Sequence, residues 1–141
     1  MIQRISIVVL MLVLAGVIGA VAESDEAVEK AGVTAAQSWL ELVDRGEYAE
    51  SWSEAASYFR NAVARSTWEQ QMVGGRKPLG RAISRKVIST KYAASLPGAP
   101  DGEYVIIQMD TSFENKRSAV ETITPMLDED GKWRVAGYFI K

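Results

Sequence analysis

The sequence predicts an α+β fold in which N-terminal helices pack on a curved, four-stranded antiparallel meander. Residues 24–75 carry apolar side chains at the three- and four-residue spacings that place them on one face of a helix. Residues 104–140 instead alternate apolar and polar side chains between turn residues, as antiparallel strands do. Because no linker or internal repeat divides residues 23–141, we expect them to form a single domain.

The first helix is expected to begin after Ser24, because a serine hydroxyl can accept a hydrogen bond from the first turn of a helix. Asp25 and Glu26 follow in that turn, where the helix dipole favours acidic side chains. Gly46 is a typical C-terminal stop. The predicted apolar face of this helix comprises Val28, Ala31, Ala35, Trp39 and Leu42.

Two further helices are predicted before the strands. The first is short and carries Tyr48 and Trp52 on one side. The second opens with a capping box from Ser66 to Glu69, in which the two side chains bond to each other's backbone N–H, and it ends at two glycines. Each of the three helices therefore carries one tryptophan, and we expect these three side chains to anchor the core.

Four strands are predicted in the second half of the chain. Val87 and Ile88 interrupt the alternation of the first strand, which indicates a β-bulge. A loop rich in proline and glycine spans residues 95–102. Turns are expected at Asn115-Lys116 and at Asp130-Gly131, of which the second is the stronger hairpin signal. The predicted strands are Leu79 to Tyr92, Tyr104 to Phe113, Ser118 to Leu127 and Trp133 to Ile140.

Two-residue turns at both hairpins would decide which side chains share a face of the sheet. One face is then aromatic and apolar and should receive the helices, whereas the other is mixed and too apolar to lie wholly in water, so part of it should be covered. A three-residue turn at Asn115 would reverse the parity of one hairpin. The apolar face comprises Val105, Ile107, Met109, Thr111, Phe113, Val120, Thr122, Met126, Trp133, Val135 and Phe139. The mixed face comprises Tyr104, Ile106, Gln108, Asp110, Glu121, Ile123, Leu127, Arg134, Ala136, Tyr138 and Ile140.

We expect the mixed face to pair with a second copy of the chain. An isologous contact would bury its apolar side chains on both copies, and a contiguous patch of this kind is unfavourable in water. The side chains concerned are Tyr104, Ile106, Ile123, Leu127, Tyr138 and Ile140.

The first 22 residues have the layout of a secretory signal. Arg4 supplies a positive n-region, Ile5 to Ile18 is almost unbroken apolar sequence, and Ala20-Val21-Ala22 ends it with the small residues that signal peptidase requires. We expect cleavage after Ala22, with a periplasmic or secreted bacterial product. The alternative is an uncleaved signal that anchors the protein in the inner membrane.

Composition excludes several classes of chemistry. The chain has no Cys and no His, which removes lipoprotein anchoring, thiol catalysis, Cys- or His-ligated metal sites and His general bases. Its 16 Lys and Arg against 18 Asp and Glu form no basic stripe, so we expect no nucleic-acid partner. No cofactor motif is present, and we expect neither cofactor nor metal.

The chain resembles an uncharacterised exported bacterial family catalogued as domain of unknown function 4019. The resemblance implies a nuclear-transport-factor-2-like (cystatin-like) α+β cone, in which sheet and long helix often enclose an apolar pocket. It carries no known activity. The matching positions are Trp39-Leu40, Asp44, Gly46, Tyr48, Ser51-Trp52, Trp68, Arg76, Pro78-Leu79-Gly80, Ser84-Arg85, Leu96-Pro97-Gly98, Asp101-Gly102, Tyr104, Phe113, Asn115-Lys116, Glu121-Thr122, Gly131 to Val135 and Gly137-Tyr138.

Asp110 and Glu121 are the strongest candidates for acid–base chemistry. The two-residue register places them directly opposite each other, where two like charges are unfavourable unless one is protonated or a cation lies between them. A different register, or a salt bridge to Arg85 or Arg134, would give them a structural role instead. The candidate ligand or partner contacts are Arg85, Asp110, Glu121, Arg134 and Tyr138.

A basic cluster follows the predicted third helix. It could meet an anionic ligand or phospholipid headgroups, or it could be a solvated strand edge whose charges discourage edge pairing. Its members are Arg76, Lys77, Arg81, Arg85 and Lys86.

Three functions are open at this point. The first is a non-catalytic exported domain that binds a partner or small ligand. The second is an isomerase, cyclase or dehydratase that uses Asp110 or Glu121 in a cone-shaped pocket. The third is a structural domain tethered by a retained N-terminal helix.

Overall fold

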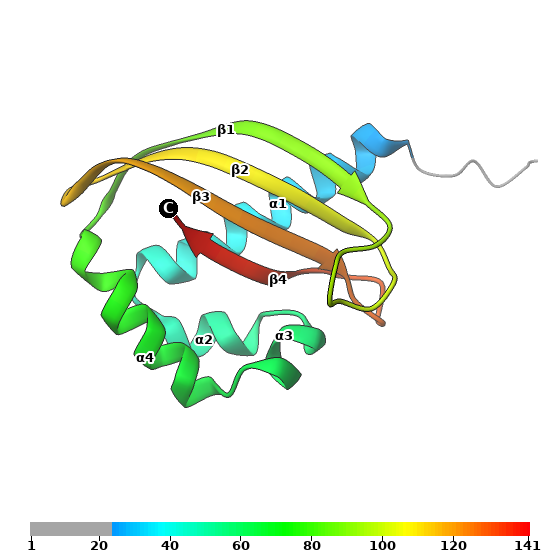
Figure 1. Cartoon of the computed structure of the whole chain (residues 1–141), viewed down its shortest axis with the longest axis horizontal. Coiled ribbons are helices and arrows are strands. Elements are labelled where there is room, and N and C mark those ends of the chain that lie inside the picture. Colours follow the sequence, from blue (N-terminus) through cyan, green and yellow to red (C-terminus); the bar gives the residue numbers. More distant parts are fainter. Residues whose placement is uncertain (1–23) are drawn as a thin grey trace, which may run out of the picture.

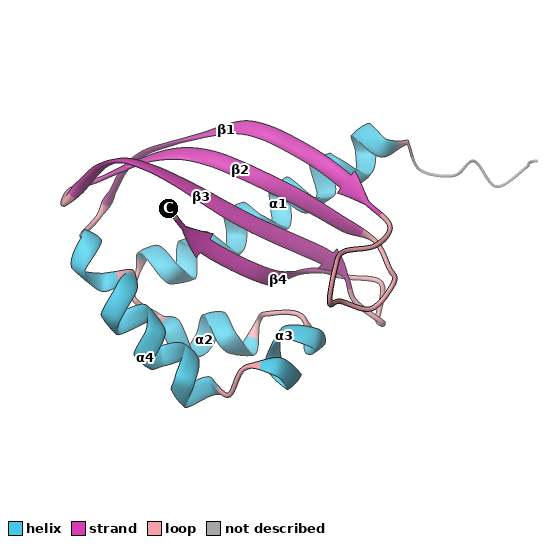
Figure 2. Ribbon diagram, in the orientation of Figure 1, coloured by secondary structure: helices cyan, strands magenta, loops and turns pink. Residues whose placement is uncertain are grey.

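The computed structural model describes residues 24–141 and confirms the α+β arrangement. The predicted leader, residues 1–22, lies outside the described residues. Four helices precede a curved antiparallel sheet of order β1-β2-β3-β4 (Figures 1 and 2). The helices are α1 (Asp25–Asp44), α2 (Tyr48–Ser53), α3 (Ser57–Ala62) and α4 (Arg65–Gly75), followed by the 3₁₀ turn η1 (Lys77–Leu79). The strands are β1 (Ala82–Ala93), β2 (Tyr104–Phe113), β3 (Lys116–Leu127) and β4 (Trp133–Ile140).

The long helix α1 begins and ends where the sequence predicts. The Ser24 hydroxyl accepts a hydrogen bond from the Ala27 N–H at 3.3 Å, and Gly46 follows the helix with a φ of +76°. The helix contacts all four strands and lies across the concave side of the sheet (Figure 1). Over residues 24–141 no helix is long and apolar enough to cross a membrane.

The segment after α1 differs from the prediction. It forms three short helices instead of two, because the Ala56 N–H donates to the Val135 carbonyl on β4 and the chain turns there into α3. The predicted capping box is wrong: α4 starts at Arg65 behind Ala64, without a side-chain cap, and Ser66 lies inside its first turn. The Trp68 N–H bonds the Ala64 carbonyl instead, at 3.0 Å.

The three predicted tryptophan anchors pack in the core as expected. Trp39 lies 6.0 Å from Trp68 and meets Tyr138 edge-on at 5.3 Å, measured between ring centroids. The indole N–H groups of Trp39 and Trp68 donate to the backbone carbonyl and the hydroxyl of Ser51, and Trp52 donates to the Val63 carbonyl. Satisfied donors and large apolar surfaces make these rings strong anchors. Together they fill the space between helices and sheet.

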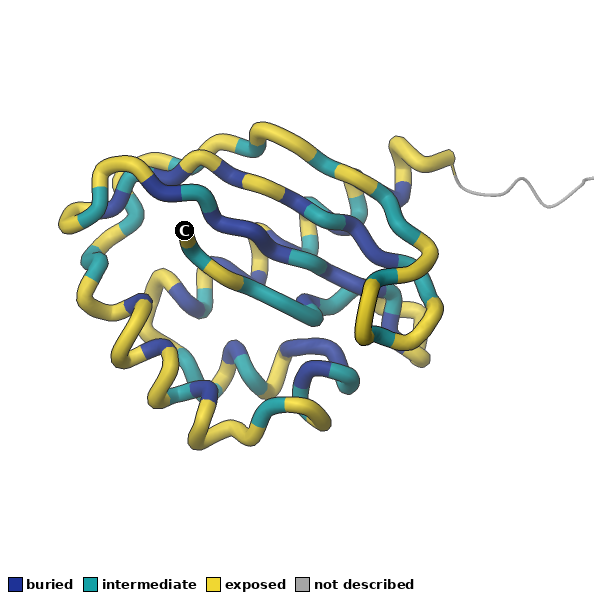
Figure 3. The backbone as a smooth tube through the Cα atoms, in the orientation of Figure 1, coloured by how far each residue is buried: buried dark blue, intermediate teal, exposed yellow. Residues whose placement is uncertain are grey.

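β2 follows the predicted pattern and β1 follows it in part: β1 begins at Ala82 instead of Leu79, which lies in η1, and it has an unpredicted bulge at Ile83. The register shifts by one residue between Val87 and Ser89, which confirms the bulge at Ile88. On β2 the predicted core positions are all buried, alternating with more exposed ones (Figure 3). These positions are Val105, Ile107, Met109, Thr111 and Phe113.

On β3 the predicted face is wrong. The turn has two residues as expected, but they are Glu114-Asn115, one position earlier than predicted, and β3 begins at Lys116 instead of Ser118. β3 then carries a bulge in which Arg117 and Ser118 oppose Ser112. This extra residue reverses the parity of the strand. Ala119, Glu121 and Ile123 therefore point toward the helices, and Val120, Thr122 and Met126 point outward.

Another bulge, in the pairing of β3 with β4, changes the end of β4. Trp133 and Val135 lie on the helix side as predicted, but Ala136 is an extra residue opposite the step from Thr124 to Pro125. Tyr138 consequently packs in the core, and Phe139, predicted to be buried, is 59% exposed. Proline has no N–H to donate to a neighbouring strand, which explains why the ladder breaks at this position.

The predicted mixed face is not one surface. Ile123 is fully buried on the helix side with Tyr138, so these two residues are not available to a second copy of the chain. Tyr104 is on the outer side, where the proline- and glycine-rich loop covers it together with Met126, as expected for a partly covered face. The Tyr104 hydroxyl donates to the Pro100 carbonyl in that loop.

Candidate functional site

A buried polar cluster lies on the concave side of the sheet, centred on Glu121. The Glu121 side chain is fully buried. Its oxygens accept two hydrogen bonds from Arg85, at 2.6 and 3.2 Å, and one each from the hydroxyls of Thr111 and Tyr138. β3 therefore supplies the carboxylate, and β1, β2 and β4 each supply one residue that donates to it.

Arg85 and Asp44 connect Glu121 to the end of α1. The Arg85 guanidinium also donates to both Asp44 oxygens, at 2.8 and 3.0 Å. Arg76, which is 3% exposed, donates to Asp44 at 3.2 Å and to the Gly80 carbonyl at 2.6 Å. The two arginines and two carboxylates balance one another in charge.

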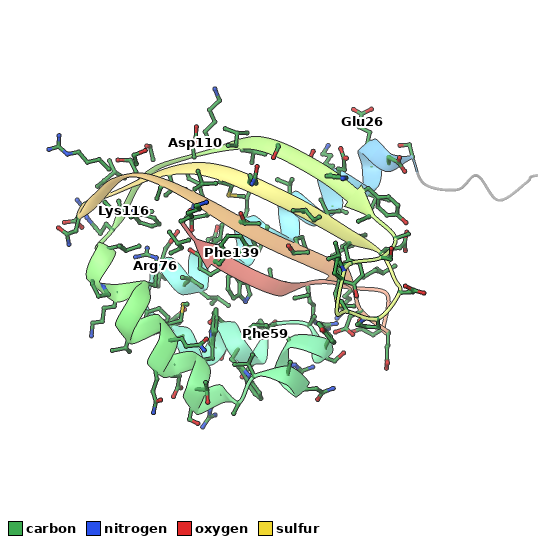
Figure 4. The ribbon with its side chains drawn as sticks, in the orientation of Figure 1. Glu26, Phe59, Arg76, Asp110, Lys116 and Phe139 are labelled. Carbon is green, nitrogen blue, oxygen red and sulfur yellow. The ribbon has the colours of Figure 1, made fainter. Side chains whose placement is uncertain are left out.

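Arg76 is held in place by packing as well as by hydrogen bonds. Its guanidinium carbon lies 4.6 Å from the centre of the Phe113 ring, a favourable cation–π arrangement. Its Nε–H has no hydrogen-bond partner within residues 24–141. Figure 4 shows Arg76 between α4 and the sheet, on the inner side.

Burial and neighbouring charges shift the pKa values of Asp44, Arg85 and Tyr138. Burial alone would raise the pKa of Asp44, but hydrogen bonds and charges from Arg85 and Arg76 outweigh burial and lower it. For Arg85, burial opposes a pKa increase, and the hydrogen bonds and charges of Asp44 and Glu121 produce one. Burial and the charge of Glu121 raise the pKa of Tyr138 well above its ordinary value. These shifts favour the ionised forms of Asp44 and Arg85 and keep the Tyr138 hydroxyl protonated, so that it can donate.

The predicted Asp110–Glu121 pair does not exist. Asp110 pairs with Val120 and is exposed on the outer side of the sheet (Figure 4). Glu121 pairs with Met109 and is buried on the inner side. The β3 bulge is the physical reason, because it turns Glu121 over relative to the two-residue register. The alternative of a salt bridge from Glu121 to Arg85 is confirmed.

Arg134 lies apart from this cluster. It donates to both oxygens of Asp130, at 2.7 Å each, and to Asp128 at 3.3 Å. Asp128 in turn accepts bonds from the N–H and hydroxyl of Ser57 at the start of α3. Arg134 thus ties the β3–β4 hairpin to α3, away from the other candidate contacts.

The predicted basic cluster is dispersed. Arg76 and Arg85 are used inside the buried polar cluster, and Arg81 pairs with Glu114 at 2.9 Å. Lys77 on η1 and Lys86 on β1 are exposed. Among the described residues, no group of three metal-ligating side chains could hold a metal ion.

An open hollow of about 660 Å³ lies at the other end of the concave side. We call it the mouth hollow. The start of α1, the end of β1 and the β3–β4 hairpin form its walls. It was not predicted, since its residues are far apart in the sequence and share no motif. Its lining residues are Asp25, Val28, Ala31, Tyr92, Glu103, Leu127, Gly131 and Trp133.

Comparisons with known proteins give one match. A family model described as "Protein of unknown function (DUF4019)" matches residues 35–138. No curated protein and no solved structure matches the chain. The matched segment runs from α1 to Tyr138, and so includes the whole buried polar cluster. The chain therefore belongs to the DUF4019 family.

Proposed function

We propose that this protein is an exported, non-catalytic domain of the bacterial envelope that binds a small ligand or partner at the mouth hollow. One contrast carries the proposal. Inside the concave side, aromatic rings fill the space and the Glu121 oxygens are occupied by hydrogen-bond donors. At the mouth hollow, Tyr92 and Trp133 are only partly buried and leave room for another molecule.

A role as a catalyst finds less support in this geometry. A general acid or base must reach the proton that it transfers. Glu121 is fully buried and accepts four hydrogen bonds. Asp110 lies on the outer side of the sheet, away from the helices, where it lines an open hollow with Lys86 and Arg117. Neither carboxylate is placed to meet a substrate in the interior.

Export is supported by the signal-like residues 1–22 and by the position of the folded domain. Ser24 caps α1 directly after the predicted cleavage site, so removal of residues 1–22 leaves every described element intact. Expression of the full chain in a Gram-negative host, followed by fractionation and intact-mass measurement, tests this. We expect a periplasmic product that starts at Glu23, and a membrane-bound product that retains Met1 would contradict it.

The processing experiment has a matched control in the cleavage site itself. Ala22→Phe replaces the small residue that the peptidase requires and should leave the signal attached. If wild type and Ala22→Phe both keep residues 1–22 in the membrane fraction, the tethered structural domain is the correct interpretation.

Binding at the mouth hollow is tested with a panel of neutral, anionic and cationic soluble probes, followed by NMR of the mature chain. We expect the largest shift changes at Tyr92 and Trp133, and their loss in Trp133→Ala. Phe139→Ala, which removes an exposed aromatic ring elsewhere, is the control and should keep the response. Probe-induced shifts centred on Glu121 and Tyr138 would favour the enzyme alternative, and the absence of any shift would contradict binding.

A further inference from the structure

The lining of the mouth hollow combines aromatic rings with acidic side chains. Tyr92 comes from β1 and Trp133 from β4, the two edge strands of the sheet, so their rings reach the hollow from opposite edges. Val28 and Ala31 of α1 add an apolar wall between them. Rings arranged on two sides of a space can offer their π faces to one guest.

The charged side chains that line the mouth hollow are all acidic. Asp25 and Glu103 line the hollow, and neither takes part in any of the ion pairs of residues 24–141. No basic residue lines it. An adjoining hollow shares Glu103 and is lined by Asp101 and Glu129, again without a basic residue. A second adjoining hollow shares Trp133 and is lined by Lys132 and by Arg134, and Arg134 is paired with Asp128 and Asp130.

Resting on the proposed function, we propose that the mouth hollow binds a small organic cation, a quaternary or methylated ammonium, between Trp133 and Tyr92. Such a cation is attracted to aromatic faces and loses little hydration, because its charge is covered by methyl groups. Asp25 and Glu103 supply the compensating charge. The partial positive charge of the α1 N-terminus would oppose a cation, and the carboxylate of Asp25 in the first turn offsets it.

The acidic surroundings favour a free solute over the same headgroup on a lipid. A phosphocholine headgroup places a phosphate a few bonds from its ammonium group, and that phosphate would face Asp101, Glu103 or Glu129 at the rim. Like charges repel at this range. The ligand therefore belongs to the class of soluble ammonium compounds without an adjacent anionic group.

The test compares choline with 3,3-dimethylbutan-1-ol, which has the same shape without the charge, and with phosphocholine. Dissociation constants are measured by NMR titration of the mature chain, following the Trp133 indole and the Tyr92 ring. We expect choline to bind about tenfold more tightly than the neutral alcohol and more tightly than phosphocholine. Equal affinity for choline and the alcohol would overturn the cation proposal.

Variants separate the ring from the charges. Trp133→Leu keeps an apolar side chain without a π face, and should weaken choline about three- to tenfold while changing the alcohol little. Asp25→Asn and Glu103→Gln should each weaken choline about threefold at low salt. Unchanged choline affinity in all three variants would contradict the assignment of the site.

Glu26→Gln is the matched control for Asp25→Asn. Both residues lie in the first turn of α1 and lose the same interaction with the helix dipole, but Glu26 does not line the hollow and points away from the sheet (Figure 4). Its choline affinity should stay close to wild type. If choline shifts nothing while neutral or anionic probes shift Tyr92 and Trp133, the cation proposal is wrong and binding at the hollow stands. If no probe shifts them, both are wrong.

Discussion

Carboxylates at the two ends of the concave side have opposite surroundings. At the closed end, Glu121 is fully buried, with donors from the other three strands around it, and Asp44 is paired with two arginines. At the mouth hollow, Asp25 and Glu103 lie beside aromatic rings without an ion pair among residues 24–141.

This difference separates carboxylates that stabilise the fold from carboxylates that remain available to a ligand. A buried carboxylate must be fully hydrogen-bonded, because burial of an uncompensated charge costs several kcal/mol. Once its partners are in place, it has no further capacity for a ligand. An accessible carboxylate can remain unpaired at little cost, and so stays available for binding.

The largest effect on stability is expected from removing a cation of the buried polar cluster. Arg85→Met leaves Glu121 buried without its cation and should lower the free energy of unfolding by about 3–5 kcal/mol. Denaturant titration measures the change. Arg81→Met is the control. It removes the exposed ion pair with Glu114 in the turn between β2 and β3 and should change the free energy of unfolding little. Equal effects of both variants would mean that the buried polar cluster is not structural.

Adjacent residues on β4 give the next largest effect. Tyr138→Ala removes a ring that packs on Trp39 and a donor to Glu121, and should cost about 3 kcal/mol. Phe139→Ala removes an exposed ring and should cost below about 1 kcal/mol. Denaturant titration of the two variants checks the β4 bulge directly. If Phe139→Ala were the more destabilising variant, Phe139 and not Tyr138 would face the helices, as the two-residue register predicted.

A smaller loss is expected at the contact between α1 and β2. A Cβ at Gly32 would lie 2.8 Å from the Val105 side chain, so Gly32→Ala should overpack this contact and cost about 1–3 kcal/mol. At Gly74 of α4 a Cβ meets open space, and Gly74→Ala should be neutral or slightly stabilising. Thermal unfolding of both variants distinguishes the sites, and similar melting temperatures would show that α1 can move away from the sheet.

The smallest effect is the dependence of stability on pH. Because the pKa of Asp44 is lowered in the folded chain, its ionised form stabilises the fold above the unfolded pKa of about 3.9, and the contribution is lost as the pH falls through the lower folded pKa. Asp128 has the same sign, first through its hydrogen bond with Ser57. Stability measured from pH 6 to pH 3 should therefore decrease, and Asp44→Asn should make this decrease shallower. A slope that Asp44→Asn leaves unchanged would contradict ion pairing in the cluster.

Much of the fold could be predicted from local patterns. The Ser24 cap, the bulge at Ile88 and the buried face of β2 were each read correctly, because each depends on a few neighbouring residues. The salt bridge between Glu121 and Arg85 was predicted only as an alternative, since the assumed register faced Glu121 outward. For Tyr138, Pro125 was the missed signal: a proline inside a strand with neighbours on both sides indicates a bulge in the pairing with β4.

The sequence by itself determined the α+β class, the order of the strands and the tryptophan anchors, because helical spacing, alternation and turn residues act over short distances. Only the tertiary structure decided which way Glu121 and Tyr138 point. Each bulge adds a single residue, and the local sequence only weakly favours one position for it. The position is decided by the contacts that the reoriented side chains then make. Glu121 turns inward to Arg85 and Thr111, and Tyr138 turns inward to Trp39. The mouth hollow arises in the same way, since only the curved sheet and α1 together bring Asp25, Tyr92 and Trp133 to one place.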